Sequence, residues 1–170
     1  MPRSLLPVAA LAALLAAAAP AHAQNEQRCH TNKAKVIRLP RGADVRVTEQ
    51  TCIIKFPVGT DRARYKAWVF TSWQPTGSGG IRPKQFEDYN VTARLEINRR
   101  GPDRVLGKRT CKIASVINRV ATGSHTCQTN VEGNFGTARV WTGDGSVVYD
   151  VDGDGRGNFP AWPLHGSPRV

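Results

Sequence analysis

The stretch Tyr89-Asn-Val-Thr-Ala-Arg-Leu-Glu-Ile-Asn98 alternates apolar and polar residues without a break. Its odd-numbered positions carry apolar side chains, and its even-numbered positions carry polar or charged ones. Because successive side chains of a β-strand point to opposite faces, this period of two predicts an antiparallel strand with one face in a core and the other toward solvent. The rest of the fold is predicted outward from this strand.

Other β patterns occur on both sides of it. Residues Tyr65 to Trp73 form a long aromatic segment with bulk on both faces, which predicts a strand in the middle of a sheet. Gly143-Asp144-Gly145 is typical of a tight hairpin turn. The proline-rich tail is expected to lie along the sheet with Phe159 and Trp162 packed against it. Further β segments are expected at residues 35–39, 44–48, 51–56, 110–117, 135–142 and 146–151, with a short one around His125 and Cys127.

No segment after residue 23 has helical periodicity of useful length. About eight short strands separated by turns, without helices, predict an all-β protein. No linker divides the chain. We therefore expect residues 24–170 to form a single antiparallel β-sandwich, or a barrel-like relative of it.

The N-terminus has the pattern of a secretory signal peptide over residues 1–23. Arg3 precedes an apolar run from Leu5 to Ala19, and Ala21-His-Ala23 is an ordinary processing site. Cleavage after Ala21 would instead place His22 first, the arrangement used by copper-dependent polysaccharide monooxygenases. The apolar run is short for a membrane span, so an extracellular protein without a span is expected. Removing 23 of the 170 residues leaves 147, enough for one core.

Four cysteines follow the signal peptide: Cys29, Cys52, Cys111 and Cys127. An even number in an exported chain predicts two disulfides, and three pairings are possible. We favour Cys29–Cys52 and Cys111–Cys127, because each pair is close in sequence and would tie adjacent strands. A zinc site is the competing interpretation, but the chain has no C-x-x-C.

The chain is strongly basic. Its formal charge is +11, and loss of Arg3 with the signal peptide lowers this to +10. Such a surplus indicates attraction to polyanions, among them cell-wall polysaccharide, although it also serves solubility. The basic residues are scattered, so no specific nucleic-acid partner is predicted.

An acidic, glycine-rich segment, Asp150-Val-Asp-Gly-Asp-Gly-Arg-Gly-Asn158, follows the last β segment. Its aspartates occupy alternate positions, as at the start of a calcium loop. An EF-hand would need a glutamate at the twelfth position, where Ala161 stands. The segment instead resembles the short D-x-D-G-D-G-x-x-D calcium loops of integrin-type propeller repeats, with Asn158 in place of the last aspartate.

We predict one Ca²⁺ ion in this segment. Its expected ligands are three carboxylates, one backbone carbonyl and one side-chain amide oxygen, from Asp150, Asp152, Asp154, Arg156 and Asn158 respectively. An ordinary Asp/Gly turn without an ion is the alternative.

Five aromatic residues could form a platform that stacks on sugars: Trp68, Phe70, Trp73, Trp141 and Trp162. Trp73 and Trp141 are the candidates for ligand binding. Core packing is the competing interpretation, since large aromatic side chains usually fill sandwich cores.

Catalysis is not favoured, and no catalytic residue is predicted. His125, Glu96 and Arg94 could serve a nuclease, but neither G-x-S-x-G nor H-E-x-x-H is present. The expected function is a secreted, non-enzymatic, calcium-stabilised binding module for an anionic or saccharide surface. The alternatives are a small secreted hydrolase or nuclease, and a proteinase inhibitor or toxin-like interaction protein that exposes the loop from Gln74 to Lys84.

Overall fold

The computed structural model describes residues 24–77, 85–99, 101–136 and 139–170. The predicted signal peptide and most of the loop from Gln74 to Lys84 lie outside these residues. The described chain is nearly all β, and its elements are β1 (Glu26–Thr31), β2 (Lys35–Ile37), β3 (Val45–Pro57), β4 (Arg62–Pro75), β5 (Phe86–Arg99), β6 (Gly101–Lys112), α1 (Ala114–Ile117), β7 (Gly123–Gln128), β8 (Glu132–Gly136), β9 (Trp141–Val151) and β10 (Trp162–Pro163).

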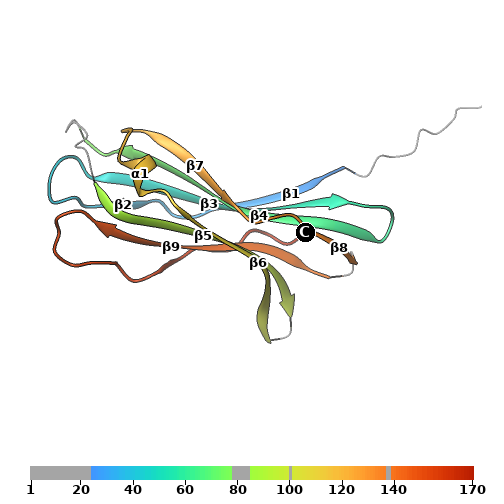
Figure 1. The fold of residues 1–170 in the computed structure, drawn as a ribbon. Coiled ribbons are helices and arrows are strands. Elements are labelled where there is room, and N and C mark those ends of the chain that lie inside the picture. Colours follow the sequence, from blue (N-terminus) through green and yellow to red (C-terminus); the bar gives the residue numbers. More distant parts are fainter. Residues whose placement is uncertain (1–23, 78–84, 100, 137–138) are drawn as a thin grey trace, which may run out of the picture.

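The strands form two antiparallel sheets that lie face to face (Figure 1). The first sheet has the order β1-β3-β4-β7, with β2 also paired to β3 and β8 to β4. The second sheet has the order β10-β9-β5-β6. The predicted antiparallel β-sandwich is therefore confirmed.

The two strands with the clearest sequence patterns lie where the patterns predict. The odd-numbered residues of β5 from Tyr89 to Leu95 are fully buried, and Ile97 is nearly so. On β4 the odd-numbered residues from Tyr65 to Trp73 face the core in the same way. Each strand lies inside its sheet, because β4 pairs with β3 and β7, and β5 pairs with β9 and β6.

The hairpin predicted at Gly143-Asp144-Gly145 is wrong, because β9 passes straight through these residues. A Cβ atom on Gly143 would collide with the carbonyl oxygen of Cys52 on β3. On Gly145 it would lie 2.6 Å from Cγ2 of Val69 on β4. The glycines therefore permit a close approach between the two sheets, which sequence patterns cannot distinguish from a turn.

The β segment predicted over residues 110–117 ends early. Strand β6 stops at Lys112, and the chain then makes the single helical turn α1. The amide of Ile117 donates a hydrogen bond of 3.0 Å to the carbonyl of Ile113, and both side chains are buried. In one turn of helix two residues four apart lie about 6 Å apart along the axis, whereas a strand would separate them by about 13 Å, so the turn lets both side chains pack close together. The segment predicted at 135–142 is likewise divided between β8 and β9.

Both predicted disulfides are present. Cys29 and Cys52 lie directly opposite each other on the adjacent strands β1 and β3. Cys111 and Cys127 instead join β6 to β7, which belong to different sheets. The expectation that each disulfide ties adjacent strands is thus confirmed for Cys29–Cys52. Cys111–Cys127 instead crosslinks the two sheets.

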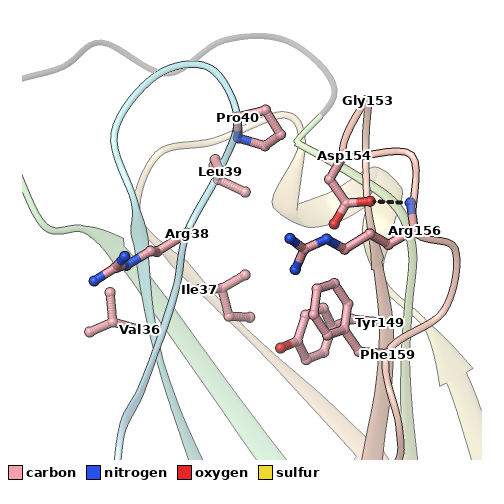
Figure 2. A pocket seen from close by; sticks show the side chains of 10 residues that line it. All are labelled: Val36, Ile37, Arg38, Leu39, Pro40, Tyr149, Gly153, Asp154, Arg156 and Phe159. Carbon is pink, nitrogen blue, oxygen red and sulfur yellow. Dashed lines mark hydrogen bonds between the residues drawn. The ribbon is translucent and has the colours of Figure 1, made fainter.

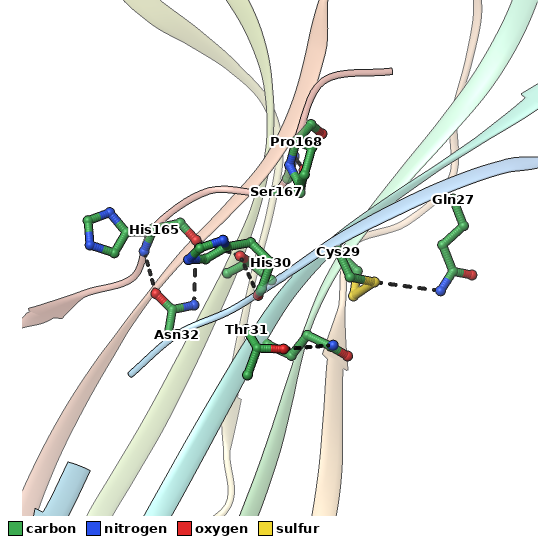
Figure 3. The surroundings of a disulfide bond; sticks show 12 residues. Gln27, Cys29, His30, Thr31, Asn32, His165, Ser167 and Pro168 are labelled. Atoms are coloured by element: carbon green, nitrogen blue, oxygen red, sulfur yellow. Dashed lines mark hydrogen bonds between the residues drawn. A yellow bond between two sulfur atoms is a disulfide. The ribbon is translucent and has the colours of Figure 1, made fainter. Parts of the chain in front are cut away.

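The C-terminal tail lies along β9, as predicted. Leu164 and Ser167 donate backbone hydrogen bonds to the carbonyls of Gly145 and Gly143. The amide of His165 donates to Oδ1 of Asn32 at 2.6 Å, next to β1 and its disulfide (Figure 3). The tail is thus held by both sheets. In the described part of the chain, no helix has the length and apolar character needed to cross a membrane.

Candidate functional site

The outer face of β4 carries an unusual row of side chains. Because the odd-numbered residues of β4 fill the core, the even-numbered ones point away from it. Three cations are followed by two aromatic rings: Arg62, Arg64, Lys66, Trp68 and Phe70. The two arginines are exposed and the other three side chains are half-buried. We call these five residues the outer β4 row.

Neighbouring strands surround the row with apolar and uncharged polar groups. Across the β3 ladder, Ile54 lies opposite Lys66 and Cys52 lies opposite Trp68. Across the β7 ladder, Gln128 lies opposite Trp68 and Thr126 lies opposite Phe70. The Trp68 indole therefore lies beside the Cys29–Cys52 disulfide, with an amide side chain on its other side.

The described part of the same face is basic. On the described outward positions of β1, β3, β4 and β7, the charged residues are Arg46, Arg62, Arg64 and Lys66, and none is a carboxylate. Alternate residues of a strand lie about 7 Å apart, so the three cations of the outer β4 row span about 14 Å. A linear array of this kind can meet several anionic groups of an extended polymer at once.

Trp73 and Trp141, the tryptophans predicted as ligand-binding candidates, are core residues. Their exposed fractions are 2% and 0%. The indole nitrogen of Trp73 donates a hydrogen bond of 3.1 Å to the Val120 carbonyl, and the Trp141 ring stacks on Tyr65 with centroids 4.3 Å apart. Because both side chains are buried, these two residues do not form an exposed sugar platform. The alternation of residues 65–73 already placed Trp68 opposite to Trp73, and that was the signal for the exposed ring.

Three glycines determine the backbone conformation of the acidic loop after β9. Gly153, Gly155 and Gly157 all have positive φ, between 70° and 75°, a conformation that glycine adopts without strain. Oδ1 of Asp154 accepts a hydrogen bond of 2.8 Å from the amide of Arg156. Among the described residues, no three side chains of Asp, Glu, His or Cys gather closely enough to hold a metal ion. Calcium binding therefore stays a prediction, and it requires the loop carboxylates to draw together.

A carboxyl group that the sequence patterns did not single out lies in the core. Glu49 is fully buried, and its carboxyl accepts hydrogen bonds from Thr71 Oγ1 at 2.7 Å and Tyr89 Oη at 3.1 Å. Burial raises its pKa to about 8, although the two hydrogen bonds oppose the change. The alternation Val45, Val47, Glu49 along β3 was the available signal, because it places a glutamate at an inward position.

Of the three residues suggested for a nuclease, Arg94 and Glu96 come together, but His125 lies apart from them. Nε of Arg94 donates to Oε1 of Glu96 at 2.8 Å, and its Nη2 donates to Oδ2 of Asp144 at 2.7 Å. These groups lie on the outer face of the second sheet, whereas His125 lies on β7 of the first, opposite Thr71. Arg94 is thus held by two carboxylates, which leaves it poorly suited to bind a phosphate.

Comparisons of the chain with protein-family models, curated proteins and solved structures found no match.

Proposed function

We propose that this protein is a secreted, non-enzymatic binding module that holds an anionic polysaccharide of the cell-wall type on the outer β4 row. The observation that supports the proposal is the succession of three cations and two half-exposed aromatic rings on a face whose described outward positions on β1, β3, β4 and β7 carry no carboxylate. Cations attract the acidic groups of such a polymer, and aromatic rings stack on the apolar faces of its sugars.

Secretion is supported by the chemistry of the cysteines. All four are in disulfides, which persist in oxidising compartments and are rare in reducing ones. The pattern of residues 1–23 favours the same route. A positive charge on the exported protein would raise the local concentration of a polyanion before any specific contact forms.

The residues of the outer β4 row have different roles in binding. Arg62, Arg64 and Lys66 contact the anionic groups, and an arginine fork can hold a carboxylate or sulfate with two parallel hydrogen bonds. Trp68 and Phe70 supply the stacking surface. Gln128 lies opposite Trp68 and can donate to a sugar hydroxyl beside the ring.

We also propose that Ca²⁺ binds the loop from Asp150 to Asn158 and stabilises the fold. The support is the spacing of the three aspartates and the left-handed glycines that let the backbone fold around an ion. When bound, the ion would neutralise the loop carboxylates.

The test measures retention on immobilised heparin and on uncharged dextran. The double variant Arg64→Gln/Lys66→Gln should elute from heparin at clearly lower salt than wild type. Its matched control, Arg104→Gln/Lys108→Gln, removes two exposed cations from β6 on the other sheet and should change elution much less. Trp68→Ala should weaken retention without any change of charge. Equal effects of the two double variants would show that net charge alone attracts the polymer, and would refute the proposed site.

A further inference from the structure

A pocket of about 600 Å³ opens at the edge of the sandwich, between the chain around β2 and the acidic loop after β9 (Figure 2). Its volume lies within the range of about 300–1,000 Å³ that is usual for small-molecule sites. The proposed polysaccharide site does not use this space, and the predicted calcium loop borders it through Gly153, Asp154 and Arg156. The residues that line the pocket come from 36–40 on one wall and from 149–159 on the other.

The floor of the pocket is apolar. Ile37 and Tyr149 belong to the main core, with 3% of each exposed. The Phe159 ring stacks on Tyr149, with centroids 4.8 Å apart and an angle of 19° between the planes. Leu39 and Pro40 extend the apolar surface along the β2 side. A ligand in the pocket would therefore meet the accessible parts of two stacked aromatic side chains and an aliphatic wall.

A hydrogen bond holds the chain on each wall of the pocket. On the β2 side, the amide of Leu39 donates to Oδ1 of Asp44 at 3.2 Å. On the other side, the amide of Phe159 donates to the carbonyl of Tyr149 at 2.8 Å. A preformed cavity spares a ligand the entropic cost of ordering its own site.

Positive charge lies at the entrance. The Arg156 side chain reaches from the loop toward Ile37, next to the two stacked rings, whereas Arg38 points away (Figure 2). Lys35 is not among the lining residues; its ammonium lies 4.9 Å from the centre of the Tyr149 ring and 5.1 Å from that of Trp162. The acidic member of the lining is Asp154, whose Oδ1 already accepts the amide of Arg156.

We propose that this pocket binds a small amphipathic anion, with an aromatic or short aliphatic body against Ile37, Tyr149 and Phe159 and its acidic group on the Arg156 guanidinium. An apolar floor with one cation at its rim complements that class of molecule in both shape and charge. The pocket is separate from the outer β4 row, because it lies between the sheets at their edge. The assignment is therefore independent of the proposed polysaccharide site.

The test uses two fluorescent probes that share a ring system. Anilinonaphthalene sulfonate carries an anionic group, and phenylnaphthylamine does not. We expect the folded protein to bind one molecule of the sulfonate saturably. Arg156→Gln should weaken sulfonate binding about tenfold, the loss of one charge-assisted contact, and should leave phenylnaphthylamine binding unchanged.

Two further variants locate the binding. Arg41→Gln removes an exposed cation near the pocket that does not line it, and it should leave both probes unaffected. Leu39→Trp fills the pocket and should abolish binding of both probes while the circular dichroism spectrum stays that of the wild type. The assignment is overturned if binding does not saturate, if Arg41→Gln equals Arg156→Gln in effect, or if a folded Leu39→Trp variant still binds.

Discussion

The hydroxyl of Tyr89 on β5 donates a hydrogen bond of 3.1 Å to Oε1 of Glu49 on β3, across the middle of the sandwich. The second carboxyl oxygen accepts from Thr71 on β4, so one buried side chain connects both sheets. The pKa of this carboxyl is raised by burial from 4.5 to about 8, and it holds its proton at neutral pH in the folded chain.

This pKa makes stability depend on pH. The pKa of Glu49 is higher in the folded chain than in the unfolded chain. The protonated side chain therefore contributes its full amount to the free energy of unfolding below about pH 4.5, and this contribution is lost as the pH rises to about 8. The loss should be on the order of a few kcal/mol. Urea unfolding across this window should show a falling free energy for wild type and a much flatter profile for Glu49→Gln. Glu132→Gln, outside the core, is the control and should keep the wild-type slope; an unchanged slope in Glu49→Gln would refute the assignment.

The two disulfides should contribute similarly to stability despite their different placement. They close segments with sequence separations of 23 and 16 residues, which correspond to about 3 kcal/mol each in the chain-entropy model. Replacing either pair by alanines should lower the free energy of unfolding in urea by about that amount. Non-reducing peptide mapping checks the pairing in the purified protein, and a Cys29–Cys111 or Cys29–Cys127 peptide would contradict it.

Calcium should raise the thermal midpoint of the wild type relative to EDTA. The gain is about 2.7 kcal/mol when the ion is at a hundredfold its dissociation constant. Asp152→Ala should abolish this response. Equal midpoints in wild type with and without calcium would show an ordinary acidic turn.

Gly143 should tolerate no side chain. Alanine there would drive its Cβ into the Cys52 backbone, at a cost of about 1–3 kcal/mol or more. Gly136→Ala is the matched control, since no atom lies within 4 Å of the added Cβ. Denaturant unfolding of both variants checks the prediction, and similar stabilities would mean that the sheets can move apart at no cost.

The fold class could be predicted because its signals are local. Alternation over residues 89–98 and 65–73 identified the inward faces of β5 and β4, and proximity in sequence identified both disulfides. The straight course of β9 through Gly143 could not be predicted, because its cause is the backbone of a strand far away in sequence. The helical turn that ends at Ile117 could not be predicted for a similar reason, because it depends on which side chains pack in the core.

The site was harder to predict than the fold. The sequence alone could not show that Trp73 and Trp141 are buried while Trp68 is half-exposed, because that depends on which face of each strand the other sheet covers. It also could not show that Arg94 and Glu96 pair while His125 lies on another sheet. Contacts between distant segments decide both questions.

The strand order also bears on how the protein reaches its native state. Strand β5 ends at Arg99, but its partner β9 begins only at Trp141, so the second sheet cannot be completed until most of the chain has taken part. Neighbouring strands β3 and β4 need only a short turn between them. We expect refolding to be slow, on a timescale of milliseconds to about seconds. Its late step should be the pairing of β9 with β5, because this pairing closes the long loop between the two strands. Pulse-labelled hydrogen exchange should show amides of β3 and β4 protected before those of β9, and simultaneous protection would contradict this order.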